Sequence, residues 1–259
     1  AGFYAFKSHR TVPAFSCMLQ PPAFSKGLKA FEKWALASGA DSYDEASGKG
    51  LLRHIYFRKA FATGQIMACA VINGEQIPDP DLLISLLKDA MPGLQSVAVN
   101  RNKSKTNVIL GNETKIIWGS EKITDILLGK KFVISPESFY QVNHDQCEKL
   151  YACVADFAEL AGTETVLDMY CGAGTIGLTL AHRCKALYGV EIVDSAVKNA
   201  RENAAINGIS NAEFLCADAF DGAKILTEKG VRPDLVIVDP PRKGCQKELF
   251  DVIDSLKVK

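Results

Sequence analysis

The sequence predicts an α/β protein in which a doubly wound, Rossmann-like parallel sheet follows a smaller α+β domain with an antiparallel sheet. Strand and helix patterns alternate after about residue 131, and a glycine-rich turn directly follows the first strand of that region. The preceding residues differ, because they combine short alternating strands with two helices. We therefore predict a substrate-side domain over residues 1–130 and a cofactor-binding domain over residues 131–259.

The elements of the first domain follow from the spacing of its apolar residues. Segments 24–38 and 81–90 place these residues at helical spacing. Alternating segments separated by turn residues predict two hairpins. The first pairs 51–58 with 66–73 around the turn Ala62-Thr63-Gly64, and the second pairs 96–100 with 107–110 around the polar run RNKSKT.

The second domain is predicted to alternate strands with helices. Such alternation implies parallel βαβ units, in which every strand ends at the same edge of the sheet. Ligands of open α/β sheets bind at that edge, so residues that follow strands are the first candidates for a site. The predicted strands are 165–169, 186–191, 212–216 and 235–239, and the predicted helices are 143–160, 175–183 and 195–207.

Composition excludes several functional classes. Lys plus Arg and Asp plus Glu both number 30, so the chain is not a polycation that grips nucleic acid without specificity. Its apolar runs are far shorter than the roughly 20 residues that cross a bilayer, and the N-terminal residues do not resemble a signal peptide. We expect a cytoplasmic protein with no membrane partner. The eight cysteines lack the paired spacing of a zinc site, so no metal is predicted here.

Gly172, Gly174 and Gly177 form a G-x-G-x-x-G pattern between a predicted strand and a predicted helix. Residues without a side chain let the backbone turn sharply and approach a ligand closely. This pattern fits either a nicotinamide dinucleotide or S-adenosylmethionine, and an NAD-dependent oxidoreductase therefore remains an alternative.

Carboxylates at the ends of four strands favour S-adenosylmethionine. Asp168 can reach the cationic amino group of a methionine moiety, whereas it would repel a pyrophosphate. Glu191 is placed to accept hydrogen bonds from ribose hydroxyls, and Asp218 from an adenine amino group. Asp239 ends the fourth strand. Each acidic residue alone could instead cap a helix, but four at one edge indicate a cofactor site.

Four motifs, together with the opening GFYAFKSHRTVPAFSC, resemble the RNA uracil-5-methyltransferases, which make 5-methyluridine in tRNA and in 23S ribosomal RNA. The resemblance covers essentially the whole chain and implies a class I methyltransferase domain that lacks its C-terminal strands. The motifs are SPESFYQVN at 135–143, DMYCGAGTIG at 168–177, GVE at 189–191 and VDPPRKG at 238–244.

The resemblance also implies roles for individual residues. Asp239 is expected to hydrogen-bond the flipped uracil as well as to contribute to the cofactor pocket. The predicted cofactor-binding residues are Gln141, Asp168, Tyr170, Gly172, Gly174, Thr175, Glu191, Asp218 and Asp239. Apart from the resemblance, the basic residues of the two hairpins are candidates for RNA contact, but such residues are usually only solvated, so we do not assign them to the site. They are Arg53, Arg58 and Lys59 on the first hairpin and Arg101, Lys103 and Lys105 on the second.

In this family a cysteine thiolate adds to carbon 6 of uracil, and a general base later removes the proton from carbon 5. The resemblance places both groups after a fifth strand, beyond residue 259, so we expect the fragment to be inactive alone. Cys171 and Cys245 do not match the nucleophile's position. The strand 235–238 is expected to be an open edge through which the chain self-associates.

The resemblance suggests that Cys17 ligates a [4Fe-4S] cluster, but only in a longer protein that supplies three further cysteines. Two alternatives to uracil methylation stay open. Asp-Pro-Pro could orient the exocyclic amino group of a purine in RNA, and the chain could be an RNA-binding module without catalysis.

Overall fold

The computed structural model describes residues 2–8, 10–14, 16–106, 108–242, 244–245, 247–256 and 258. The chain divides into two compact units. Unit 1 comprises Ala1–Ile123 and Ser135–Glu137, and unit 2 comprises Thr124–Ile134 and Ser138–Lys259.

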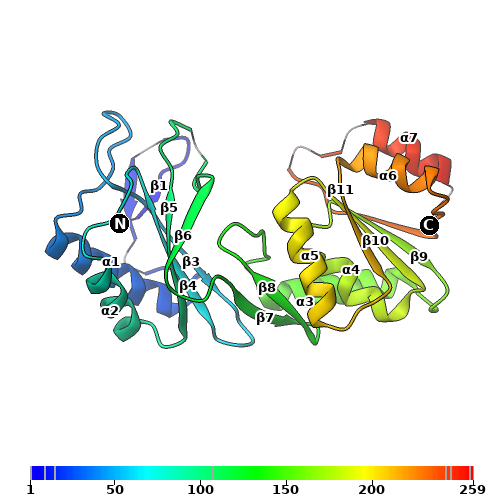
Figure 1. Cartoon of the computed structure of the whole chain (residues 1–259), viewed down its shortest axis with the longest axis horizontal. Helices are drawn as coiled ribbons and strands as arrows, with labels where there is room; N and C mark the ends of the chain where they lie inside the picture. Colours follow the sequence, from blue (N-terminus) through cyan, green and yellow to red (C-terminus); the bar gives the residue numbers. More distant parts are fainter. Residues whose placement is uncertain are drawn as a thin grey trace. The chain divides into compact units, whose positions relative to one another are not determined.

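Unit 1 contains a four-stranded sheet with two helices packed on one face (Figure 1). Phe31, Trp34 and Leu83 are fully buried between these helices and the sheet, which accounts for the helical spacing of apolar residues. The helices are α1 (Pro22–Ser38) and α2 (Pro80–Ala90), and the strands are β3 (Leu52–Lys59), β4 (Ile66–Ile72), β5 (Leu94–Arg101) and β6 (Glu113–Gly119). A separate antiparallel pair joins β1 (Gly2–Tyr4) and β2 (Thr11–Pro13).

The sheet of unit 1 is antiparallel at both outer pairs and parallel at its centre. The predicted hairpin of β3 and β4 is confirmed. Strands β4 and β5 are parallel because the chain crosses over through α2 between them. The order is therefore β3-β4-β5-β6 with one crossover.

The second predicted hairpin is wrong in its return strand. Strand β5 pairs with β6 rather than with 107–110, of which Asn107 lies outside the described residues. The Asn102 side-chain amide donates to the carbonyl oxygens of Val108 and Ile109, at 2.7 and 3.0 Å. Asn100 likewise accepts from the Gly111 amide at 2.6 Å. These side chains hold the segment as a loop and take the place of strand pairing.

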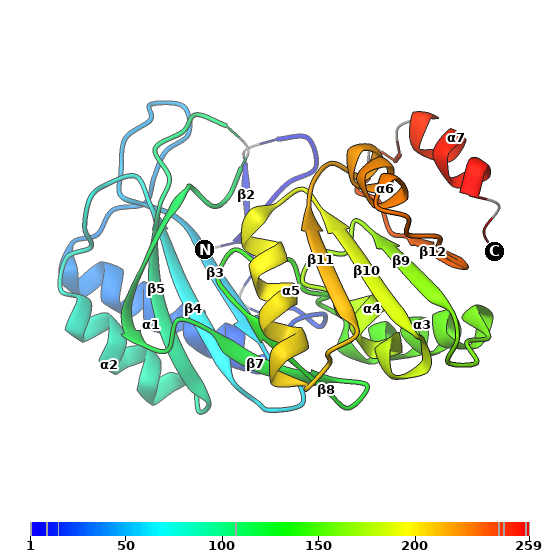
Figure 2. The same cartoon turned by 45° about the vertical axis from the view of Figure 1, so that its right-hand side comes forward.

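Unit 2 has a parallel four-stranded sheet covered on both faces by helices (Figure 2), and this confirms the predicted fold class. The strands are β9 (Thr165–Met169), β10 (Ala186–Glu191), β11 (Ala212–Cys216) and β12 (Leu235–Val238). The helices are α3 (His144–Ala158), α4 (Thr175–Leu180) with the 3₁₀ turn Ala181–Arg183, α5 (Asp194–Ile206), α6 (Ala219–Glu228) and α7 (Lys247–Leu256). Helix α6 and the hairpin of β7 (Ile123–Leu127) and β8 (Lys130–Ile134) were not predicted.

Alternate residues of the central strand β9 enter two different cores. Val166 packs with Tyr151 of α3 and Leu178 of α4, whereas Leu167 packs beside Ala223 of α6 and Leu249 of α7. Both faces of the strand are buried, which explains its nearly continuous apolar sequence.

The strand order β11-β10-β9-β12 creates a switch point beside β9. The chain first builds outward from β9 to β11 and then returns to place β12 on the other side of β9. A crevice forms outside the carboxyl ends of the two strands that flank such a reversal. The residues after β9 and β12 therefore border the expected ligand site.

Strand β12 lies at one edge of this described sheet. Self-association through it stays a prediction. In the part of the chain that the structure describes, every helix is too short or too polar to cross a membrane.

Replacing Gly177 with alanine is expected to destabilise unit 2. A β-carbon there would lie 2.8 Å from Leu187 and 2.9 Å from an Asp168 carboxylate oxygen, so one of them must move. Overpacking of this kind costs roughly 1–3 kcal/mol, although glycine to alanine within a helix usually stabilises. The check is the free energy of unfolding in urea, and an unchanged or higher value for Gly177→Ala would contradict this packing.

Candidate active site

The glycine-rich loop bends sharply at the carboxyl end of β9. Tyr170, Gly172 and Gly174 have φ values of +61°, +56° and +77°, in the left-handed region. Glycine adopts this conformation without cost, but for Tyr170 it is strained by roughly 1–2 kcal/mol. Strain that persists in a native structure is commonly found at functional sites. The two glycines thus allow the turn, and Tyr170 is held within it.

Asp168 lies buried beneath this loop, and only one of its two carboxylate oxygens has a hydrogen-bond partner. Its residue is 1% exposed, and its Oδ2 accepts a hydrogen bond from the Gly177 amide at 2.9 Å. Its Oδ1 is buried and has no hydrogen-bond partner in the structure. A buried acceptor without a partner is costly, so this atom is suited to a ligand that brings a donor.

The charge state of Asp168 reflects these surroundings. Burial above all, with smaller contributions from the charges of Asp239 and Glu191, raises its pKa to about 7, against the opposing effect of the Gly177 hydrogen bond. The three carboxylates are therefore close enough to interact. Among the described residues no group of His, Cys, Asp or Glu is arranged to hold a metal ion. The cluster instead suits an organic cation.

Glu191, at the end of β10, ties the glycine-rich loop to the next strand. Its Oε2 accepts from the Gly172 amide at 3.0 Å, and its Oε1 accepts from the Val193 amide at 2.9 Å. Each carboxylate oxygen can accept a second hydrogen bond. Glu191 therefore organises the loop and retains capacity for ligand hydroxyl groups.

Asp218 caps helix α6 by accepting from the Phe220 amide at 2.9 Å. The capping role that the sequence left open for acidic residues is thus realised here, and binding of adenine stays a prediction. Asp218 is nevertheless near the site: burial above all, then the neighbouring Cys245 and lastly the charge of Asp218 raise the pKa of the Tyr170 hydroxyl.

The remaining predicted residues lie on three segments. Asp239 is exposed directly after β12. The Thr175 hydroxyl, at the start of α4, forms a hydrogen bond with the buried Tyr151 hydroxyl at 2.9 Å. Gln141 is half-buried in the loop before α3, and the neighbouring Tyr140 hydroxyl donates to Asp125 at 3.4 Å. The structure thus brings Asp168, Glu191 and Asp239 together and shows Thr175 anchored.

Comparison with known proteins identifies the family. A family model described as tRNA (Uracil-5-)-methyltransferase matches residues 93–258. The chain belongs to this family. It is 43% identical over 258 residues to an uncharacterised RNA methyltransferase of Caldanaerobacter subterraneus, covering 100% of the chain and 57% of that relative. A Clostridium tetani relative described in the same way is 42% identical, with coverages of 98% and 55%. The chain thus spans little more than half the length of these curated relatives.

Solved structures agree with this assignment. The tRNA (uracil-54, C5)-methyltransferase of Pyrococcus abyssi, in complex with S-adenosyl-L-homocysteine, superposes with a TM-score of 0.79 at 27% identity, covering 96% of this chain and 58% of that one. Wild-type Trm5b from the same organism gives a TM-score of 0.51 at 16% identity, with coverages of 78% and 56%, and shares the fold alone.

Two cysteines of this family member lie next to the site. Cys171 is buried within the glycine-rich loop, and burial, with the charges of Asp168 and Glu191, raises the pKa of its thiol far above the usual range. A nucleophilic cysteine needs an accessible thiolate. Cys171 is therefore unsuited to attack a substrate, and Cys245 packs against the same hydrophobic cluster as Tyr170.

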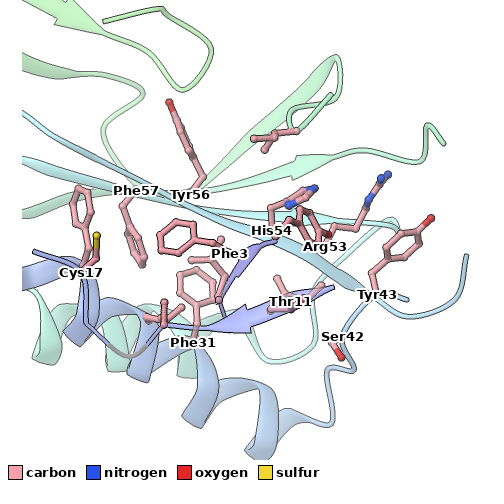
Figure 3. A pocket seen from close by; sticks show the side chains of 18 of the residues that line it. Phe3, Thr11, Cys17, Phe31, Ser42, Tyr43, Arg53, His54, Tyr56 and Phe57 are labelled. Atoms are coloured by element: carbon pink, nitrogen blue, oxygen red, sulfur yellow. The ribbon is translucent and has the colours of Figure 1, made fainter. Parts of the chain in front are cut away.

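A cavity of about 1240 Å³ lies in unit 1 (Figure 3). Its aromatic lining includes Phe3, Phe31 and Phe57 towards one end and Tyr43 beside Arg53 at the other. The predicted cofactor residues are absent from its described lining. Cys17 lies on the cavity wall, and its role as an iron-sulfur ligand remains a prediction for a longer chain.

The basic residues considered as RNA contacts differ in their exposure and in their interactions. Arg53 has a structural role, because its side chain is only 1% exposed and donates to the carbonyl oxygens of Asn102 and Ser104. Arg58 is also partly buried. Arg101 and Lys103 form ion pairs with Glu75, and Lys59 lies over the Phe61 ring, whereas Lys105 is exposed. These interactions favour a structural role for most of the set.

The sequence patterns did not identify the buried polar residues whose hydrogen bonds support the loops of the site. Asn199 and Asn203 of α5 are buried, at 4% and 0% exposure, and hydrogen-bond to loops around the site. Their signal was available as asparagines at a spacing of four on the face of a helix that should be apolar.

The raised pKa of Asp168 makes stability depend on pH. The folded state holds the Asp168 proton up to about pH 7, whereas an unfolded aspartate loses it near pH 4. The free energy of unfolding should therefore fall as pH rises through this window. Asp168→Asn removes the titration. The free energy of unfolding of the variant, relative to that of the natural chain, should therefore increase by about 1–3 kcal/mol from pH 5 to pH 8.

Chemical denaturation of both proteins at the two pH values measures this gain. The Asp234→Asn variant, altered at the opposite end of the sheet, is the control. If Asp168→Asn and the natural chain lose stability equally between the two pH values, Asp168 does not titrate in this range.

Proposed function

We propose that the protein containing this chain transfers a methyl group from S-adenosylmethionine to carbon 5 of a uridine in RNA. The observation that carries the proposal is the buried Oδ1 atom of Asp168, which has no hydrogen-bond partner and lies at the switch point of the sheet. Membership of the uracil-5-methyltransferase family supports the reaction, as does the S-adenosyl-L-homocysteine bound by the similar Pyrococcus enzyme.

The residues present fit this cofactor. The ammonium group of its methionine moiety would give Asp168 Oδ1 the donor that it lacks, and the cation would favour the ionised carboxylate. Glu191 retains acceptor capacity for the ribose hydroxyls. A side chain at Gly172 would point into open space above the loop, which is consistent with room for a ligand there. When bound, the cofactor supplies an electrophilic methyl group.

Asp239 is the residue that we assign to the uracil. It follows β12, across the switch point from Asp168, and it is exposed while its charge reaches the buried carboxylate. From this position its carboxylate can accept a hydrogen bond from the N–H of a base that has been flipped out of its stack. Gln141, Tyr170 and Thr175 complete the proposed pocket.

The nucleophile and the general base are assigned outside residues 1–259. A thiolate must add to carbon 6 so that carbon 5 becomes nucleophilic, and a base must then take the proton from carbon 5. Cys171 does not meet these needs, as its burial shows. Because the resemblance to the family places both groups after a fifth strand, we expect this chain alone to bind the cofactor without completing turnover. The target is RNA, with tRNA favoured by the Pyrococcus relative and ribosomal RNA as the other class.

Methylation at carbon 5 displaces the hydrogen there, which provides a direct test. The full-length protein, incubated with S-adenosylmethionine and RNA labelled with tritium at carbon 5 of uridine, should release tritium to water. Asp239→Ala should lower the rate by about a hundredfold or more, comparable to removing one hydrogen-bonding group from a catalytic site.

The matched control is Asp234→Asn, which alters the carboxylate at the other end of β12, where Oδ2 accepts from the Thr165 amide. It should keep nearly full activity. Methyl transfer without tritium release, with the new methyl group on a purine amino group, would contradict carbon-5 methylation.

A further inference from the structure

Helix α5 and the residue that caps its C-terminus carry a row of asparagines on one side. Asn199, Asn203 and Asn207 are spaced by four residues and so lie on one side of the helix. Asn199 and Asn203 are buried and Asn207 is half-buried. Asparagine is seldom buried, because its amide must then find partners for both donor and acceptor atoms. The row is therefore expected to serve a specific contact.

The contacts form an ordered series along β8 and the loop that follows it. Asn207 accepts from the Lys131 amide at 2.8 Å and donates to the Lys131 carbonyl at 2.7 Å. One turn earlier, Asn203 accepts from the Val133 amide at 2.8 Å. Another turn earlier, Asn199 donates to the Ser138 hydroxyl at 2.8 Å. The helix thus fixes the chain that leads into Gln141.

Asn203 differs from Asn207 in its second partner. Its side-chain amide donates to the carbonyl oxygen of Ala173 at 2.9 Å, and Ala173 lies between Gly172 and Gly174 of the glycine-rich loop. One buried side chain therefore bridges β8 and the glycine-rich loop. The Ala173 peptide is flanked by residues in the left-handed region, so its orientation depends on such an external hydrogen bond.

We propose that Asn203 is a positioning residue that couples the glycine-rich loop to the segment carrying Gln141. An apolar side chain here would leave the Val133 amide and the Ala173 carbonyl without partners. The loop and the segment would then move independently, and the pocket would lose its fixed width. The inference rests on the proposed function, because it assigns both segments to one cofactor.

Asn207 provides the matched control. Asn203→Ala and Asn207→Ala each remove two hydrogen bonds to backbone atoms outside α5, and Asn207→Ala also removes a bond to the Asn203 carbonyl. Only Asn203→Ala releases the glycine-rich loop. Both variants should therefore lose thermal stability. By calorimetry on this chain, the Kd for S-adenosylhomocysteine should rise about tenfold or more in Asn203→Ala and stay within about twofold in Asn207→Ala, since a lost buried hydrogen bond is worth about one decade.

Hydrogen exchange gives a second readout that needs no ligand. The amides of residues 172–177 should exchange faster in Asn203→Ala than in Asn207→Ala, because their loop is released only in the former. Asn203→Ser, which keeps a small polar group, takes the place of Asn203→Ala if the alanine variant does not fold, and the same differences are expected.

The outcomes separate this inference from the proposed function. If the natural chain binds S-adenosylhomocysteine and both variants lose affinity and exchange protection equally, the coupling role of Asn203 is overturned and the proposed function stands. If the natural chain does not bind S-adenosylhomocysteine at all, both proposals fail.

Discussion

The hydrogen bond from the Gly177 amide to the buried Asp168 carboxylate is the interaction on which the site depends. It joins the end of β9 to the first turn of α4 and thereby closes the glycine-rich loop between them. Gly177 is required because a β-carbon would occupy the space that the carboxylate needs. The same geometry leaves the other carboxylate oxygen buried and without a partner. One contact therefore both builds the loop and prepares it for a cationic ligand.

The rest of the site is arranged around this carboxylate by the topology of the sheet. The strand order places β12 beside β9, so Asp239 lies close enough for its charge to raise the pKa of Asp168. Glu191 approaches from β10 on the other side and holds the Gly172 amide. Like charges close to a buried carboxylate are unfavourable without a counter-charge. The fold tolerates this cost where a cofactor that is itself cationic is expected.

The carboxylates and strands could be predicted because they obey simple rules. The strand 165–169 is buried on both faces and is followed by glycines, and acidic residues that follow parallel strands must share one edge. Strand β6 was missed because Asn100 and Asn102 hold the preceding segment in a loop, which no periodicity reveals. The structural role of Arg53 could not be predicted, since its neighbours in space, Asn102 and Ser104, are far away in the sequence. Contacts between residues that are far apart in the sequence cannot be predicted from a local sequence pattern.

Family membership and the geometry of Asp168 together lead to one central claim: the edge of the sheet is a site for S-adenosylmethionine, although its glycines would also suit a dinucleotide. A thermal-shift titration of the natural chain with S-adenosylhomocysteine and with NADH tests this claim most directly. A ligand that binds the folded state raises the melting temperature with increasing concentration. We predict that S-adenosylhomocysteine stabilises the chain and that NADH does not, and stabilisation by NADH alone would contradict the account.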